Sequence, residues 1–321
     1  MAKALAGIDL GGTTIKAALA DTDGMPLVER SIPTQSHFGA ADVLERIGQL
    51  IETMSSESNR EVAAIGVGVP GLVNIATGIT RFLPNFPGQW RDVAVAESLR
   101  TRLKAPVRLL NDARTATLAE LKFGHGVEQP NITLAFFTLG TGVGGGVAIN
   151  GHLRLGPLGA AGELGHQTIR ADGPRCGCGN RGCLETLASG PAIAAEGVRL
   201  MRMGLAPALH NLVAGNADLV TTREMAVAAE TDAAIREAIL SAANYIGIAA
   251  ANVVTILHPD LIVLGGGVAE LGDILTDTVT SVIHTRVGMF PADNVRVARS
   301  RLGERAGVLG AVALAAEAAS S

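Results

Sequence analysis

Three cysteines that lie close together in the sequence could bind a metal ion. Cys176, Cys178 and Cys183 stand in the stretch CGCGNRGC, and His166 precedes them in GELGH. Three thiolates and one imidazole make a Cys₃His set, which is enough for a closed tetrahedral zinc site. The alternative is three free buried thiols, but the intervening glycines allow a knuckle of tight turns. We therefore expect His166, Cys176, Cys178 and Cys183 to hold a structural zinc ion.

Three glycine-rich turns are a second group with possible chemistry. IDLGGTTIKAAL (8–19) and TLGTGVGGGVAI (138–149) share one plan of strand, glycine and threonine turn, and second strand, and Gly265-Gly266-Gly267 follows another apolar run. A tight hairpin explains any one of these turns, because adjacent glycines supply positive φ. Backbone N–H groups in such turns can also receive phosphate. Three such turns in one chain favour binding of a nucleotide, although each turn can also be explained as a simple hairpin.

Two common nucleotide motifs are excluded. GTGVGG (140–145) matches the GxGxxG pattern, but the apolar, strand-like GVAI follows it, where a dinucleotide fold needs a helix. The chain also lacks the Gly-Lys-Ser/Thr of a Walker A loop.

The pair Asn111-Asp112 stands where an apolar strand ends and a helical pattern begins. Either residue could simply cap that helix. A carboxylate at the carboxyl end of a strand is also placed to accept a proton from an attacking hydroxyl. Both roles can coexist in the pair.

The elements that position these groups alternate between strands and helices. Apolar runs at 63–71, 107–112, 133–142 and 260–267 predict strands buried on both faces. Helices are expected at Ala41–Met54, Arg91–Leu103, Ala113–Phe123, Glu185–Met203, Thr231–Leu257 and Glu304–Ala318. We expect two similar α/β domains that share an interdomain cleft, because ligands collect beyond the carboxyl ends of strands. The first domain would span residues 1–121 plus the C-terminal helix 304–321, and the second, with the zinc site, residues 122–303.

Composition excludes some function classes. The formal net charge is −4, which gives no broad basic surface for nucleic acid. No apolar run is expected to span a membrane, and glycines interrupt the N-terminus before a signal-peptide core develops. We expect a cytoplasmic globular protein.

Together these motifs resemble one family. DLGGTT, Asn111-Asp112, LGTGVGGG, GELGH, CGCGNRGCLE and LGGGV occur in the order found in ROK-family sugar kinases, which belong to the actin-like ATPase superfamily with a ribonuclease H-like fold. The resemblance spans Gly7 to about Gly310, and GELGH followed by CGCGNRGCLE is its most specific part. Bacterial ROK glucokinases are the nearest likeness.

The resemblance implies a sugar site. Asp112 would be the catalytic base that takes a proton from a sugar hydroxyl. The other implied sugar-binding residues are Gly71, Asn85 in LPNFPGQW, Asn111, Glu163, Glu185 and His166, the last of which would also bind zinc.

It also implies an ATP and Mg²⁺ site. The phosphates would contact both glycine–threonine turns, the third glycine cluster would lie by the adenosine, and Asp9 would act on Mg²⁺ through water. The residues implied are Gly11, Gly12, Thr13, Thr14, Lys16, Thr141, Gly142, Gly265, Gly266 and Gly267.

The expected reaction is phosphorylation of glucose by ATP, as part of carbohydrate metabolism and glycolysis. Alternatives are an N-acetylmannosamine, N-acetylglucosamine or fructose kinase, and a sugar-responsive ROK repressor. A repressor is disfavoured, because only about six residues precede the first expected strand and no basic recognition helix is found. Family likeness further implies a homodimer or homotetramer.

Two positions depart from the family pattern. Arg114 stands where many relatives have asparagine, which suggests a phosphate contact or an altered helix start. Pro87 and Gly88 lengthen the approach to the tryptophan in LPNFPGQW.

Overall fold

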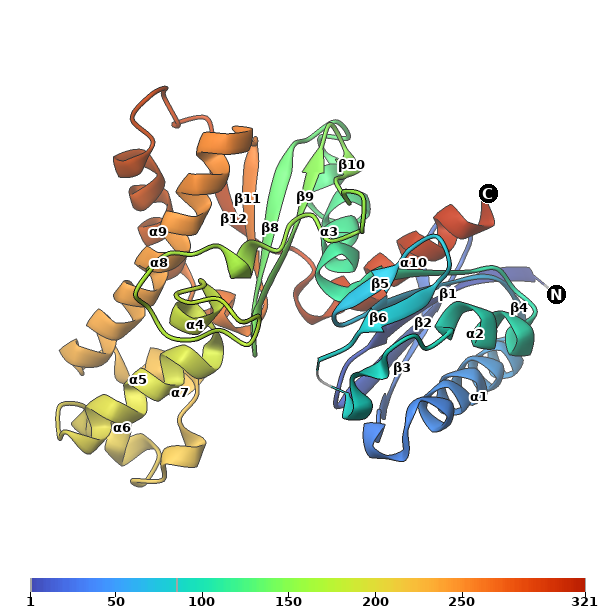
Figure 1. Cartoon of the computed structure of the whole chain (residues 1–321), viewed down its shortest axis with the longest axis horizontal. Coiled ribbons are helices and arrows are strands. Elements are labelled where there is room, and N and C mark those ends of the chain that lie inside the picture. Colours follow the sequence, from blue (N-terminus) through green and yellow to red (C-terminus); the bar gives the residue numbers. More distant parts are fainter. Residues whose placement is uncertain (1, 85, 321) are drawn as a thin grey trace. The chain divides into compact units, whose positions relative to one another are not determined.

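The computed structural model describes residues 2–84 and 86–320, and the chain divides into two compact units (Figure 1). Unit 1 comprises Met1–Asn131, Gly151–Ala161 and Arg301–Ser321, and unit 2 comprises Ile132–Asn150 and Gly162–Ser300. Residues 122–131, 151–161 and 301–303 thus belong to unit 1, although the sequence-based division assigned them to the second domain. The sequence-based domain boundaries stay a prediction.

Unit 1 is built on a mixed five-stranded sheet of order β3-β2-β1-β4-β7. The strands β1 (Ala2–Leu10), β2 (Thr14–Ala20) and β3 (Pro26–Pro33) are antiparallel neighbours, and β4 (Arg60–Val69) and β7 (Val107–Asn111) run parallel to β1. A short hairpin of β5 (Leu72–Asn74) and β6 (Ile79–Phe82) follows β4.

Helices cover both faces of the unit 1 sheet. Successive side chains of a strand point to opposite faces. Accordingly, Ile8 of β1 shares a core with α1 (Ala40–Ser58) and α2 (Val95–Leu103), whereas Leu5 packs with α10 (Ala306–Ala319). The helix α3 (Asp112–Lys122) packs on α10 through Leu118 and Leu314. Short 3₁₀ turns occur at Ser36–Phe38, Pro87–Trp90, His125–Val127 and Gly303–Arg305.

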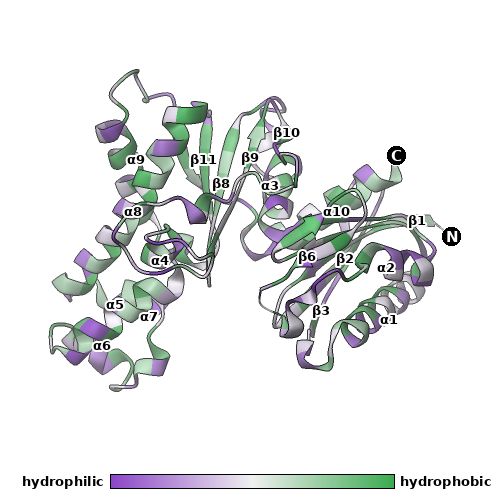
Figure 2. Cartoon of the chain, in the orientation of Figure 1, coloured by the Kyte–Doolittle hydropathy of each residue, from purple (hydrophilic) through white to green (hydrophobic). Residues whose placement is uncertain are grey.

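Unit 2 repeats this plan in a sheet of order β10-β9-β8-β11-β12. The strands β8 (Leu134–Leu139) and β9 (Val143–Ile149) form an antiparallel hairpin like that of β1 and β2. The edge strand beyond β9, β10 (His152–Leu153), comes from the segment 151–161 that is counted with unit 1. The strand β11 (Leu261–Gly265) is parallel to β8 as β4 is to β1, and β12 (Arg296–Arg299) is parallel to β11. The predicted pair of similar α/β halves is therefore confirmed, and Figure 2 shows β8 and β11 as largely hydrophobic.

The helices of unit 2 pack on the face of this sheet that carries Ala135, Phe137, Ile262 and Leu264. They are α4 (Glu185–Ala188), α5 (Gly190–Arg202), α6 (Pro207–Leu212), α7 (Thr222–Ala228), α8 (Ala233–Leu257) and α9 (Asp273–Arg286), with 3₁₀ turns at Leu164–His166, Ala217–Leu219 and Gly267–Leu271. The sequence patterns did not predict α6 and α7. The helix expected to start near Val268 is a 3₁₀ turn at Gly267–Leu271 followed by α9.

Two of the predicted helices include residues whose backbone is not helical. The helix expected over Arg91–Leu103 begins only at Val95, because Asp92 adopts a φ of 55°, which no α-helix contains. The helix expected over Glu185–Met203 is interrupted at Ser189, whose extended backbone and hydroxyl begin α5 by accepting the Ala192 N–H at 3.3 Å.

Helix α8 corrects one expectation. By length and composition alone it could cross a membrane, although no such segment was expected. In its most apolar window 56% of the residues are buried, and Ile239, Ile246 and Val254 lie in the core of unit 2. Such burial is typical of a core helix in a soluble protein, so the match is weak support for a membrane span.

Candidate active site

The first glycine turn joins β1 to β2 in unit 1. Gly11 N–H donates to Thr14 O at 3.0 Å, which closes the turn. Thr34, just beyond β3, stabilises this turn with two hydrogen bonds. Its hydroxyl donates to Gly11 O at 2.6 Å, and its N–H donates to Thr13 O at 2.8 Å. Three carbonyls of the turn, those of Gly11, Thr13 and Thr14, thus accept hydrogen bonds from the protein. The turn is fixed as a hairpin, and the phosphate contacts predicted for Gly11, Gly12, Thr13 and Thr14 stay predictions.

Asp9 and Lys16 are paired across the two strands of this hairpin. Burial raises the pKa of the Asp9 carboxyl, and the Lys16 ammonium opposes that shift. A carboxylate whose charged form is disfavoured by burial gains from a nearby divalent cation, and its oxygens are the ligands Mg²⁺ prefers. Asp9 therefore fits the predicted role toward Mg²⁺.

Gly307, in the first turn of α10, faces Asp9. A side-chain carbon added at Gly307 would lie 2.4 Å from Asp9 Oδ2, so only glycine leaves the carboxylate where it is. The sequence does not indicate a role for Gly307, because a glycine within a helical pattern carries no signal of a partner nearly 300 residues away.

Asn111 is the N-cap of α3. Its Oδ1 accepts the N–H groups of Ala113 at 3.0 Å and Arg114 at 3.3 Å, and its Nδ2 donates to Gly71 O at 3.0 Å. The capping role considered from the sequence is therefore confirmed for Asn111. Gly71 itself has a φ of 90°, and a side-chain carbon there would lie 2.1 Å from Phe82 O. The structure thus brings together Asn111 and Gly71, two residues predicted to bind sugar.

Asp112 is the first residue of α3, at the carboxyl end of β7. Its Oδ1 accepts the Ala113 N–H at 2.7 Å. The side chain is only partly buried, so the carboxylate is accessible at the edge of the sheet where ligands bind in α/β folds. Asn85, the remaining predicted sugar ligand of unit 1, lies outside the described residues.

Arg114 is buried, with 1% of its surface exposed. Its guanidinium donates to Asn111 Oδ1 at 2.9 Å, to Ala160 O at 2.8 Å and to Ala161 O at 3.0 Å, all within unit 1. These contacts do not support the phosphate contact suggested by the sequence.

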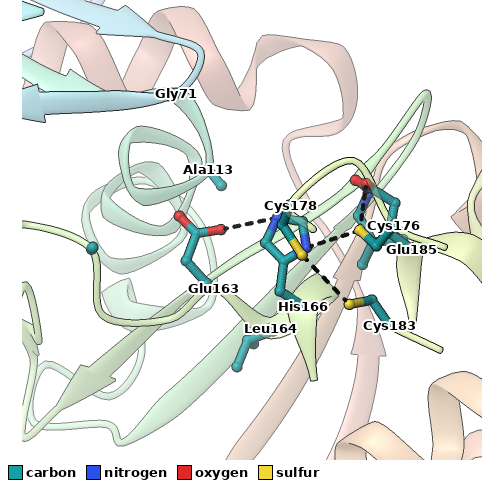
Figure 3. A network of polar contacts seen from close by, with 12 residues as sticks. Gly71, Ala113, Glu163, Leu164, His166, Cys176, Cys178, Cys183 and Glu185 are labelled. Atoms are coloured by element: carbon teal, nitrogen blue, oxygen red, sulfur yellow. Dashed lines mark hydrogen bonds and ion pairs between the residues drawn. The ribbon is translucent and has the colours of Figure 1, made fainter. Parts of the chain in front are cut away.

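The predicted zinc ligands come together in unit 2 (Figure 3). The ligand atoms of His166, Cys176, Cys178 and Cys183 all lie within 4.8 Å of one another. Cys178 Sγ and Cys183 Sγ are 3.8 Å apart, and Cys176 Sγ lies 3.6 Å from His166 Nδ1. Zinc bonds of about 2.3 Å to sulfur and about 2.0 Å to nitrogen give tetrahedral edges of about these lengths. The cluster therefore fits a zinc ion held by four protein ligands.

The three thiols of the cluster differ in their electrostatic environments. Burial raises the pKa of the Cys183 thiol to about 12 and also raises that of Cys176, whereas the backbone N–H of Asn180 lowers the pKa of the exposed Cys178. Two buried thiols thus resist ionisation unless a positive charge stabilises the thiolates.

His166 presents its two nitrogens to different partners. Nδ1 faces the sulfurs, and Nε2 lies 3.9 Å from Glu163 Oε2, as Figure 3 shows. A metal on Nδ1 leaves the proton of a neutral imidazole on Nε2. That N–H and the half-exposed Glu163 carboxylate can then both meet a polyhydroxylated ligand.

Glu185, the first residue of α4, connects the cluster to the second glycine turn. Its Oε2 accepts the Val143 N–H at 3.0 Å, and its Oε1 lies 3.9 Å from Cys176 Sγ. Three residues predicted to bind sugar therefore lie at one cluster. His166 belongs to it, Glu163 lies beside His166, and Glu185 lies beside Cys176.

A cavity of about 570 Å³ lies in unit 2, beside the second glycine turn of the chain (138–149) and the third (Gly265-Gly266-Gly267). Thr141 and Gly267, both predicted to bind nucleotide, contribute to its wall. In contrast, Gly265 packs toward Phe136 and Gly266 toward Leu139 O. The other lining residues were not predicted from the sequence. They are Gly140, Gly190, Pro191, Ala194, Val220, Thr221, Thr222 and Val268. The only available signal was Ser189-Gly190-Pro191, which interrupts a helical pattern.

Two α/β units with mixed five-stranded sheets, each beginning with a strand–glycine turn–strand hairpin, define the actin-like ATPase class of fold. A family model described as "ROK family" matches residues 5–318, and the chain belongs to this family.

Individual relatives include both enzymes and regulators. The glucokinase of Thermotoga maritima is 35% identical over 98% of this chain and 97% of its own length. The xylose repressor of Caldicellulosiruptor bescii is 30% identical over 96% of this chain and 77% of the repressor. A ROK family glucokinase from Streptomyces griseus, solved in complex with glucose and AMPPNP, superposes with a TM-score of 0.84 at 30% identity and covers 98% of this chain and 99% of its own.

Proposed function

We propose that the protein is an ATP-dependent hexose kinase that converts glucose to glucose 6-phosphate. The observation that carries the proposal is the pair Asn111-Asp112 at the carboxyl end of β7, where Asn111 caps α3 and leaves the neighbouring carboxylate accessible. The likeness to glucokinases over nearly the full length of both chains supports glucose as the substrate.

In the proposed mechanism Asp112 is the general base. It accepts the proton of the sugar 6-hydroxyl as that oxygen attacks the γ-phosphorus of ATP, and ADP leaves with the electrons of the broken P–O bond. Sugar hydroxyls would be held by Gly71, Asn85, Asn111, Glu163, His166 and Glu185. Amide, carboxylate and imidazole groups suit this task, because each hydroxyl that is taken from water must be matched by a partner.

ATP would use both glycine turns. The cavity beside Thr141 and Gly267 has room for an adenosine, and Lys16, whose ammonium lies 3.3 Å from exposed Glu304, can exchange that partner for a phosphate. Bound Mg²⁺ supplies charge neutralisation at the phosphates, and Asp9 would hold it through water. The zinc ion would be structural, because four protein ligands leave no open position.

The family resemblance also supports a cytoplasmic homodimer or homotetramer that acts in carbohydrate metabolism. A second candidate function, sugar-responsive transcriptional repression, is favoured by the 30% identity to a xylose repressor. N-acetylmannosamine, N-acetylglucosamine and fructose are alternative kinase substrates.

A coupled assay with ATP, Mg²⁺ and a panel of sugars tests the proposal. We expect glucose to give the highest kcat/KM, followed by other hexoses. Preferred turnover of an N-acetylated sugar or fructose would correct the substrate. Sugar binding with no ADP release from any sugar would contradict the kinase and favour the repressor.

A further inference from the structure

Arg114 is a buried charged side chain that the proposed mechanism does not use. It lies in the first turn of α3, where its positive charge opposes the helix dipole. A buried guanidinium is tolerated when its donors are matched by acceptors. Here three donors of Arg114 reach three different oxygens, which belong to Asn111, Ala160 and Ala161.

The first of these contacts fixes the Asn111 side chain. Asn111 Oδ1 accepts from Arg114 Nη1 and also from the backbone N–H groups of Ala113 and Arg114. If the Asn111 amide were flipped, its NH₂ group would face these three donors and could bond to none of them. The flipped orientation is therefore excluded. Nδ2 is thereby directed to the Gly71 carbonyl, at 3.0 Å, and keeps one further hydrogen for a ligand.

The other two contacts fix the end of a loop. Arg114 Nη2 and Nε hold two consecutive carbonyls, Ala160 O at 2.8 Å and Ala161 O at 3.0 Å. Ala161 N–H closes the loop by donating to Leu155 O at 3.0 Å. From Ala161 the chain continues directly to Gly162 and Glu163. Alanines offer no side-chain hydrogen bond, so the carbonyl contacts hold this end.

We propose that Arg114 is a positioning residue for sugar binding. Its guanidinium joins Asn111, on the helix of the proposed base, to the segment that leads to Glu163 and His166. This inference rests on the proposed function. It assigns the arginine to the sugar rather than to the ATP phosphates. The planar guanidinium of arginine is required, because the single ammonium of lysine cannot donate to three oxygens in these fixed directions.

The test compares Arg114→Lys and Arg114→Met with a matched surface variant, Arg100→Met. Arg100 also lies in unit 1, but 62% of its side chain is exposed and its ion pair is with Glu97, an exposed neighbour on the same helix. KM and kcat are measured separately for glucose and for ATP. Calorimetry measures glucose binding, and thermal unfolding verifies the fold.

We expect both Arg114 variants to raise KM and Kd for glucose by about tenfold to a hundredfold, since each loses hydrogen bonds to a charged donor. KM for ATP should stay within about twofold of wild type, and kcat should fall less than KM rises. Arg100→Met should match wild type in every measurement.

Four outcomes would overturn the inference. Wild-type glucose KM in Arg114→Lys would show that charge alone suffices. A raised KM for ATP with normal glucose binding would restore the phosphate contact. Unchanged KM, Kd and kcat in Arg114→Met would show that Arg114 has no role in sugar binding. Failure of Arg114→Lys to fold would show that Arg114 acts in stability instead. Failure of the proposed function is distinct, because the wild-type chain would then release no ADP with any sugar.

Discussion

Gly307 and Asp9 lie in contact, although 298 positions separate them in the chain. The site of an added side-chain carbon at Gly307 is 2.4 Å from Asp9 Oδ2, closer than any real side-chain carbon stands. The first turn of α10 therefore leaves space for the carboxylate at the end of β1.

The first prediction follows from this contact. Gly307→Ala should displace the Asp9 carboxylate and raise KM for Mg-ATP by about tenfold to a hundredfold, because small misplacements of charged groups are costly in phosphoryl transfer. Glucose affinity should change little. Gly288→Ala is the matched control, since no atom lies within 4 Å of an added carbon there. A normal KM for Mg-ATP in Gly307→Ala would separate Asp9 from the nucleotide.

The second prediction concerns Thr34, which is fully buried behind the first glycine turn. Thr34→Val keeps the shape but loses the hydroxyl that donates to Gly11 O. The unmatched carbonyl should destabilise the chain by about 1–3 kcal/mol and raise KM for ATP severalfold. Urea unfolding and steady-state kinetics measure the two effects. Thr34→Ser keeps the donor and should stay near wild type; equal loss in both variants would argue against the hydroxyl contact.

The third prediction is that zinc is structural. Metal analysis should find about one zinc ion per chain, and Cys178→Ala should lose it together with about 3 kcal/mol or more of stability. For a unit of this size that loss lowers Tm by roughly 6–12 °C. A chelator should destabilise the wild type in the same direction. A fully active, zinc-free preparation with unchanged Tm would refute the assignment.

The fourth prediction concerns Asp112, on which the proposed mechanism depends. Asp112→Asn retains size and hydrogen bonding but cannot accept the sugar proton. It should lower kcat by at least about a hundredfold, while glucose binding measured by calorimetry weakens only modestly. Lost binding with preserved kcat would make Asp112 a positioning residue, and near-normal turnover would exclude it from the mechanism.

The sequence alone determined the features that depend on near neighbours. Continuous apolar runs that end in glycine predicted both hairpins, because strand burial and turn chemistry are local properties. The four zinc ligands were also predictable, since they lie between His166 and Cys183 and only a short chain needs to close. The N-cap position of Asn111 followed from the boundary between β7 and α3.

The tertiary structure decided which distant groups meet. Nothing local to Gly307 indicates Asp9, and nothing local to Arg114 indicates the carbonyls of Ala160 and Ala161. Likewise, residues around Gly190 and Val220 line the cavity beside Thr141 only because helices α5 and α7 return to the same edge of the sheet. Backbone propensity and hydrophobic period act over a few residues, whereas a side chain's partner depends on how whole elements pack. The sequence therefore determined the turns and the zinc ligands, and the fold determined what supports them.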